Sequence, residues 1–207
     1  MKKYSSLVVI LLLFFNTPLK ADDIKEFEIE GMSIGDSLLD HFNEKDIKKE
    51  LNSEYVYKYK KKFVKVATGY GEGFYLIKNF DKYDDIGISL KINDNKYLIY
   101  GISGRIFCDA GIDICFSKQK KISSDIKSFL GEKINFSTWE NIWSQDKSQK
   151  SKVYGNDFKF KDSDDIISIS VYDYSETYTK KTKFYDHTSV TIFSKEYYDF
   201  IQNEAYK

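Results

Sequence analysis

The alternation of apolar and polar residues predicts a chain of short strands interrupted by a few helices. A strand is expected wherever apolar side chains recur at every second position between turn-forming residues. The segments with this pattern are Tyr55–Thr68, Phe74–Phe80, Ile86–Ile92, Lys96–Phe107, Lys152–Phe160, Ile166–Tyr174 and Ser189–Phe193. The second half of the chain is therefore expected to hold three strands.

The N-terminal segment Glu26–Leu51 combines a strand pattern with two helix starts. Its first residues, around Phe27, alternate with charged side chains and predict an edge strand. Asp36 or Ser37 can cap a helix that follows, and Asn43 can cap a second short helix. We therefore expect a strand, a turn and helical structure before the first long strand.

Two longer helices are predicted farther along the chain. In Ser117–Leu130 the apolar residues recur at helical spacing, and Gly131 is a natural C-terminal stop. Ser194 is placed to cap a C-terminal helix whose apolar side is formed by aromatic and aliphatic residues.

The two tryptophans of the chain lie four residues apart in a segment that also has a helix signal. Ser137 and Glu140 have the spacing of a capping box, which predicts a short helix with Trp139 and Trp143 on one face. Such a pair packs in a core or forms a platform on which a sugar ring stacks. The core interpretation is the commoner one, and the binding interpretation stays open.

The order of these elements predicts the α+β class, with antiparallel sheet packed by helices. The length after a leader fits one domain, residues 22–207. The same order also suggests a helix-plus-three-strand unit used twice, in halves of about 22–116 and 117–207.

Cys108 and Cys115 are the only cysteines. In an exported chain a disulfide between them is the default expectation. A metal pair would need two further ligands at usable spacing, and a redox dithiol would have the C-x-x-C spacing. The sequence therefore favours a structural disulfide and predicts no metal site.

Residues 1–21 have the features of a secretory signal peptide. Lys2 and Lys3 precede the apolar run Leu7–Phe15, and a small residue, Ala21, stands at the expected cleavage point. The run is too short for a membrane anchor. We therefore expect a periplasmic or secreted protein without a membrane span in the mature chain.

Charge and composition limit the classes of binding partner that the sequence predicts. Cleavage after residue 21 removes three lysines and no acid, which changes the formal charge from zero to −3. This balance excludes a nucleic-acid binder that works through a basic surface. The 17 tyrosines and 16 phenylalanines could form a carbohydrate-binding surface, but a genome rich in A/T codons would enrich them as well. The expected partner is a protein or another envelope component.

Candidate catalytic groups are few. The chain has two histidines, His41 and His187, and neither a G-x-S-x-G nor an H-E-x-x-H motif. The acidic run Asp162–Asp165 lacks the glycine and the glutamate of a calcium loop. No catalytic residue and no cofactor are predicted. The alternative is a hydrolase whose site includes His187 and Asp186.

Three segments carry a family resemblance: IEGMSIGDSLLDHF, KYLIYGISGRIF and VTIFSKEYYDFI. Together with the cysteine-containing segment that runs into a helix, they resemble an uncharacterised family of small exported proteins from marine alphaproteobacteria. The resemblance extends over nearly all of the mature chain. It implies export and, because no activity is established for that family, no catalytic residue.

A second likeness is to the small module of the outer-membrane barrel-assembly machinery, which shares a glycine-turn-helix opening and an antiparallel sheet. That module is usually lipid-anchored, whereas this chain has no cysteine at the cleavage point. From the sequence we expect a non-enzymatic exported protein that binds through its sheet or through the face of Trp139 and Trp143. A periplasmic hydrolase is the alternative.

Overall fold

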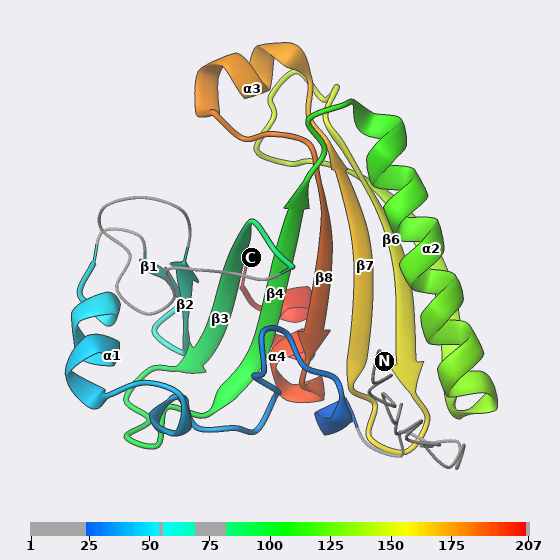
Figure 1. The fold of residues 1–207 in the computed structure, drawn as a ribbon. Helices are drawn as coiled ribbons and strands as arrows, with labels where there is room; N and C mark the ends of the chain where they lie inside the picture. Colours follow the sequence, from blue (N-terminus) through cyan, green and yellow to red (C-terminus); the bar gives the residue numbers. More distant parts are fainter. Residues whose placement is uncertain (1–23, 54–55, 69–81, 206–207) are drawn as a thin grey trace, which may run out of the picture.

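A computed structural model describes residues 24–53, 56–68 and 82–205 (Figure 1). In these residues eight antiparallel strands form one sheet with four α-helices around it, which confirms the predicted α+β class. The strands are β1 (Val56–Tyr59), β2 (Phe63–Thr68), β3 (Asp85–Lys91), β4 (Ile99–Phe107), β5 (Ile134–Ile142), β6 (Lys152–Phe160), β7 (Ile166–Asp173) and β8 (His187–Phe193). The α-helices are α1 (Glu44–Leu51), α2 (Ile112–Leu130), α3 (Glu176–Thr182) and α4 (Lys195–Asn203). The predicted leader and the predicted strand Phe74–Phe80 lie outside the described residues.

The strand order is β1-β2-β3-β4-β8-β7-β6-β5. Each half of the chain therefore contributes four consecutive strands, and the two groups join where β4 pairs with β8. The predicted repeating unit had three strands, whereas each half has four. The duplication itself stays a prediction.

The predicted strand Tyr55–Thr68 is a hairpin. The backbone turns at Lys60 and Lys61, which have positive φ angles of 42° and 58°, and Tyr59 pairs with Phe63 across the turn. Glycine and asparagine are the usual residues at such angles. Because lysines stand there instead, the sequence offers no turn signal.

The prediction of a helix that carries Trp139 and Trp143 is wrong, because this segment forms β5 and the turn after it. Trp139 pairs with Gly155 of β6, and Phe136 of the same strand pairs with Phe158. Aromatic and β-branched residues suit a paired strand, so pairing with β6 outweighs the local capping-box signal. Residues four apart lie on one side of a strand as well, so the tryptophans still share a face.

The N-terminal segment packs on the sheet without forming the predicted edge strand. It contains two short 3₁₀-helices, Ile24–Glu26 and Leu38–Asp40, and one isolated bridge, Ile29 to Met32. Ser37 caps the second 3₁₀-helix and Asn43 caps α1, as predicted. The apolar residues of the segment are buried in the main core: Ile24, Ile29, Met32, Ile34 and Leu38.

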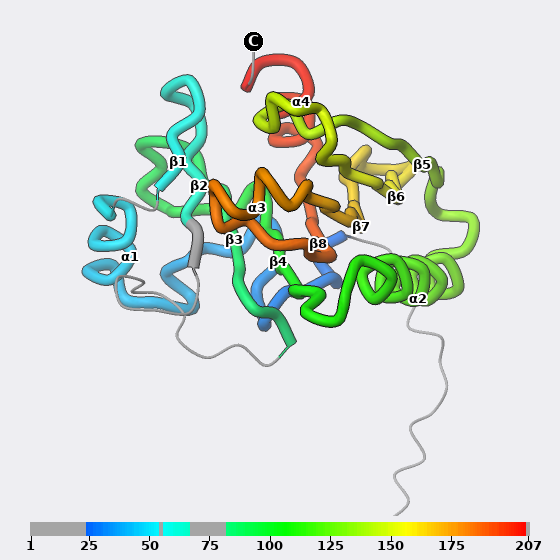
Figure 2. Tube along the Cα trace, turned by 90° about the horizontal axis from the view of Figure 1, so that it is seen from above, coloured from blue at the N-terminus to red at the C-terminus, as the bar shows by residue number. Residues whose placement is uncertain are grey.

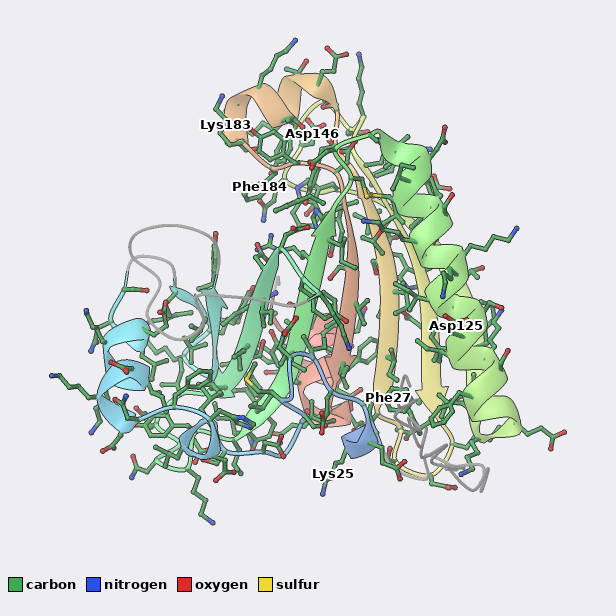
Figure 3. The ribbon with its side chains drawn as sticks, in the orientation of Figure 1. Lys25, Phe27, Asp125, Asp146, Lys183 and Phe184 are labelled. Carbon is green, nitrogen blue, oxygen red and sulfur yellow. A yellow bond between two sulfur atoms is a disulfide. The ribbon has the colours of Figure 1, made fainter. Side chains whose placement is uncertain are left out.

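Helix α2 covers β7 and β8 on the same side of the sheet as the N-terminal segment (Figures 1 and 2). It begins at Ile112, one and a half turns before the predicted start, and it ends at Gly131 as predicted. Gln119, buried against the sheet, donates from Nε2 to the backbone carbonyls of Tyr154 and Ile169, both at 2.8 Å. Near the C-terminal end of α2, Phe27 packs edge-on against Phe129 (Figure 3).

The sheet is curved, and α3 and α4 lie on its concave side (Figure 2). Helix α4 follows the predicted Ser194 cap. Helix α3 occupies the segment between β7 and β8 for which no helix was predicted, and Ser175 caps it. Among the described residues, no helix has both the length and the apolar character needed to cross a membrane.

The predicted disulfide is present between Cys108 and Cys115. Their Cα atoms are 5.7 Å apart, and the bond ties the end of β4 to the first turn of α2. Both cysteines pack with Val171 of β7. The cross-link therefore fixes the entry of α2 onto the sheet.

Replacing both cysteines by serine is expected to lower the free energy of unfolding by about 2.5 kcal/mol, because the unfolded chain regains the entropy of this short loop. Urea unfolding followed by circular dichroism measures the change. Dithiothreitol should bring the wild type to the level of the double variant and leave the variant itself unchanged. A wild type whose stability is insensitive to the reductant would contradict the prediction.

Candidate functional site

The middle of the concave side carries small hydroxyl residues, and we name this surface the serine face. Phe193 of β8 packs against Tyr197 of α4, so its side chain points to the concave side of the sheet. Since directly paired residues point to the same side of a sheet and side chains alternate along each strand, the strand pairings identify the others. The hydroxyl residues of the serine face are Ser89, Ser103, Ser168, Ser170, Ser189 and Thr191.

One row of paired residues crosses the serine face over six strands. Its members, from β3 to β5 in sheet order, are Asp85, Arg105, Ser189, Ser170, Gly155 and Trp139. Neighbouring strands are about 4.8 Å apart, so Arg105 and Trp139 are about 19 Å apart along the sheet. The row thus has an ion pair at one end, an indole at the other, and short side chains between them.

Hydrogen bonds among short side chains hold the middle of the face. Ser168 donates to Asp157 Oδ1 at 2.6 Å, and the hydroxyl groups of Ser168 and Ser170 are 3.3 Å apart. Ser189 and Thr191 form a similar pair at 3.2 Å. Five of the six hydroxyl residues are buried, with exposures of 2–6%, and Thr191 is partly exposed.

Along the direction of the strands, the serine face is bounded at one end by an aromatic cluster, where α4 packs on the sheet. Phe63 of β2 contacts Tyr100, Tyr197 and Phe200, with ring centroids 4.9–5.6 Å apart. Phe63 and Phe200 are completely buried, at 0% and 1% exposure. This cluster fixes α4 on the concave side.

A second aromatic cluster forms the opposite end, beneath α3. Trp143 lies edge-on to Tyr172 and Tyr174, and its Nε1–H donates to the hydroxyl of Tyr178 at 3.0 Å. The ring of Tyr172 stacks on that of His187, with centroids 4.5 Å apart. The cluster therefore holds α3 against the ends of β7 and β8.

The loop after Trp143 is tied to α3 through one carboxylate. Asp146 accepts hydrogen bonds from the hydroxyls of Ser151 and Ser175, at 2.6 and 2.8 Å, and from the backbone amide of Ser148. The Ser151 hydrogen bond is the main reason why the pKa of Asp146 is far below its ordinary value. Figure 3 shows Asp146 beside α3, with Phe184 on the sheet side of that helix.

The two tryptophans therefore have different surroundings. Trp143 is engaged by a hydrogen bond and two aromatic neighbours, so its contacts are those of a structural residue. Trp139 lies over Gly155, where a Cβ would come within 2.0 Å of the indole. Both indoles are partly exposed, but among the described residues only the ring of Trp143 has aromatic neighbours and a hydrogen bond, so the ring of Trp139 is the one available as a platform.

His187 and Asp186, the residues of the hydrolase alternative, hold local structure. His187 is 3% exposed, and its Nδ1 lies 2.9 Å from the carbonyl oxygen of Tyr185. Burial lowers the pKa of His187 to about 3, which makes it a weak base. Asp186 accepts a hydrogen bond from the backbone amide of Tyr174 at 2.8 Å. The other histidine, His41, lies 3.7 Å from Asp36 on the N-terminal segment.

Two basic side chains and one acid meet at the β2–β4 end of the serine face. Arg105 Nε donates to Asp85 Oδ1 at 2.5 Å, and the second carboxylate oxygen contacts Nη2. Burial raises the pKa of Asp85, against the opposing effect of Arg105. Lys65 lies on the neighbouring strand, opposite Ser89.

The amine of Lys65 lies over Gly87. Its Nζ is 3.0 Å from the position that a Cβ on Gly87 would occupy, and the hydroxyl oxygen of Ser103 is 2.9 Å from the same position. Burial, assisted by the charge of Arg105 and opposed by that of Asp85, lowers the pKa of Lys65 to about 8. Lys65 forms no ion pair or hydrogen bond with a residue that the structure describes.

A hollow of about 460 Å³ lies elsewhere, between α3 and the loop that follows β4. Its acidic side chains are partly engaged, since Glu176 pairs with Lys180 at 3.3 Å and Asp186 holds the Tyr174 amide. Within the described residues, no cluster of three histidine, cysteine or acidic side chains could hold a metal ion. The serine face is therefore the better candidate, because it combines an indole platform with the amine of Lys65, which has no ion pair with a described residue.

The sequence identified Trp139 but not the residues that complete this face. Lys65, Arg105 and the serines carry no motif, and their proximity follows from the pairing of strands distant along the chain. Searches of protein-family models, curated proteins and solved structures found no match to this chain.

Proposed function

We propose that this protein is an exported, non-enzymatic binding protein and that its serine face holds a small saccharide. The observation that carries the proposal is the row from Arg105 to Trp139, in which a partly exposed indole stands at one end of a strip of short, largely buried hydroxyl side chains. Sugar rings stack on indoles through their C–H faces and exchange hydrogen bonds with hydroxyl and carboxylate groups. A strip of about 19 Å accommodates a short oligosaccharide.

Export is supported by the leader pattern of residues 1–21 and by the Cys108–Cys115 disulfide, which is typical of oxidising compartments. A periplasmic or secreted protein would meet saccharides of the cell envelope. Binding without catalysis is favoured because the candidate base His187 is buried and engaged.

The proposal predicts that sugars change the fluorescence of Trp139. Trp143→Phe leaves Trp139 as the sole indole, so its emission can be titrated with glucose, N-acetylglucosamine and their acidic derivatives glucuronate and N-acetylmuramate. We expect a saturable change with at least one of these sugars. Trp139→Ala should weaken binding of that sugar at least about tenfold while the melting temperature changes little, because the side chain is partly exposed.

Phe136→Ala is the matched control, since it truncates an aromatic residue of the same strand on the opposite side of the sheet. It should leave sugar binding unchanged. A Trp139 emission that none of the four sugars alters would contradict the proposal. Hydrolysis of an oligosaccharide by the purified protein would favour the enzymatic alternative instead.

A further inference from the structure

At the Lys65 end of the serine face, one of the two basic side chains has no ion pair with a described residue. Arg105 is neutralised by Asp85 through a two-point ion pair, whereas Lys65 has no comparable partner among the described residues. The neighbouring acid Asp84, whose carboxylate accepts the backbone amide of Phe107 at 2.6 Å, acts on Asp85 and is not among the charged groups that shift the pKa of Lys65. The amine of Lys65 therefore lies at a partly enclosed position without an ion pair to any described residue.

The residues next to the amine of Lys65 have small side chains. Gly87 lies beneath the amine, and the hydroxyl of Ser103 flanks it. An amine that is removed from water without a partner is costly, and an anion is the group that satisfies it best. The glycine leaves room for the amine where any larger residue would displace it, since a Cβ there would lie 2.3 Å from the last carbon of the lysine chain.

We propose that Lys65 and Arg105 form an anion subsite and that the ligand of the serine face is an acidic saccharide. Its carboxylate or phosphate group binds at Lys65, with Arg105 contributing long-range attraction, and a sugar ring lies toward Trp139. The lowered pKa of Lys65 agrees with this geometry, because a bound anion would favour the protonated amine and raise the pKa again. This inference rests on the proposed saccharide binding and names its chemical class.

The test compares two pairs of sugars that differ in a carboxylate: glucuronate with glucose, and N-acetylmuramate with N-acetylglucosamine. Affinities are measured by calorimetry and by Trp139 emission in the Trp143→Phe protein. For at least one pair, the acidic sugar should bind about tenfold or more tightly than the neutral one. Lys65→Met should remove this preference, and Lys65→Gln provides a second neutral variant.

Lys58→Met is the matched control, because Lys58 is an exposed lysine of the adjacent strand and points to the other side of the sheet. It should retain the full preference. The melting temperature of Lys65→Met should equal or exceed that of the wild type, since an unpaired, desolvated amine has been replaced by an apolar chain. A loss of sugar preference accompanied by a large fall in melting temperature in both Lys65 variants would instead assign Lys65 a structural role and overturn the inference.

The outcomes separate the two proposals. Equal affinity for acidic and neutral sugars would overturn the anion subsite and leave saccharide binding intact, whereas no binding of any sugar would overturn both. Inorganic phosphate distinguishes the source of the anion. If phosphate alone binds as tightly as the acidic sugars, the site is a general anion site and the saccharide class is wrong; weaker binding of phosphate supports the proposal.

Discussion

Replacing Phe63 by alanine should lower the free energy of unfolding by about 3–5 kcal/mol. The ring is fully buried between the sheet and α4, where it contacts Tyr100, Tyr197 and Phe200. Truncation removes the central member of this cluster, so the cost combines lost apolar burial with a cavity. We also expect faster amide hydrogen exchange in α4, because the helix meets the sheet through this cluster.

Urea unfolding and hydrogen exchange measure the two effects. Tyr57→Ala is the control, since Tyr57 is an aromatic residue of the neighbouring strand that is 57% exposed. It should change stability by no more than about 0.5 kcal/mol. Equal losses in the two variants would show that the position of Phe63 beneath α4 is not what matters.

Stability should fall by about 2 kcal/mol between about pH 8 and pH 5 because of His187. Burial lowers the pKa of this histidine from 6.5 to about 3, although the carbonyl of Tyr185 opposes the shift. The unfolded chain therefore takes up a proton below about pH 6.5, while the folded protein does so only near pH 3. Acidification favours the unfolded state throughout this interval, and the total effect is on the order of 4 kcal/mol.

Thermal and urea unfolding at several pH values measure this dependence. His187→Asn should flatten it above about pH 5, because the titrating group is gone, while an amide can still donate toward the carbonyl of Tyr185. His41→Asn, at the other histidine, should keep the wild-type dependence. Below about pH 4 the lowered pKa of Asp146 adds a further loss, so the upper part of the range is the diagnostic one. A wild type equally stable at pH 8 and pH 5 would contradict a buried neutral His187.

Most of the strands could be predicted because each has its own local signal. The segments around β3, β4, β6, β7 and β8 alternate in polarity and are separated by turn residues. The same local signal misplaced β5, where the spacing of Ser137 and Glu140 favours a helix but pairing with β6 decides the structure. It also missed the turn at Lys60 and Lys61, whose side chains do not mark the bend.

The candidate site could be predicted only in part, since its residues are neighbours through strand register. Trp139 and Arg105 belong to opposite halves of the chain and share a row because four successive strand pairings align them. Lys65 is one of several lysines in an alternating segment, and only the glycine and the arginine beside it distinguish it from the others. These neighbours are set by the three-dimensional fold, and no characteristic spacing in the sequence indicates them.

The pairing of β4 with β8 has a consequence for the order in which the chain can complete its fold. A ribosome releases β4 (Ile99–Phe107) long before β8 (His187–Phe193), yet the two are neighbours at the centre of the sheet. Until the C-terminal strand arrives, β4 and β7 each present an unpaired edge, which is the kind of surface that promotes association between chains. The sheet can therefore close only after synthesis of the last strand, and both edges stay open until then.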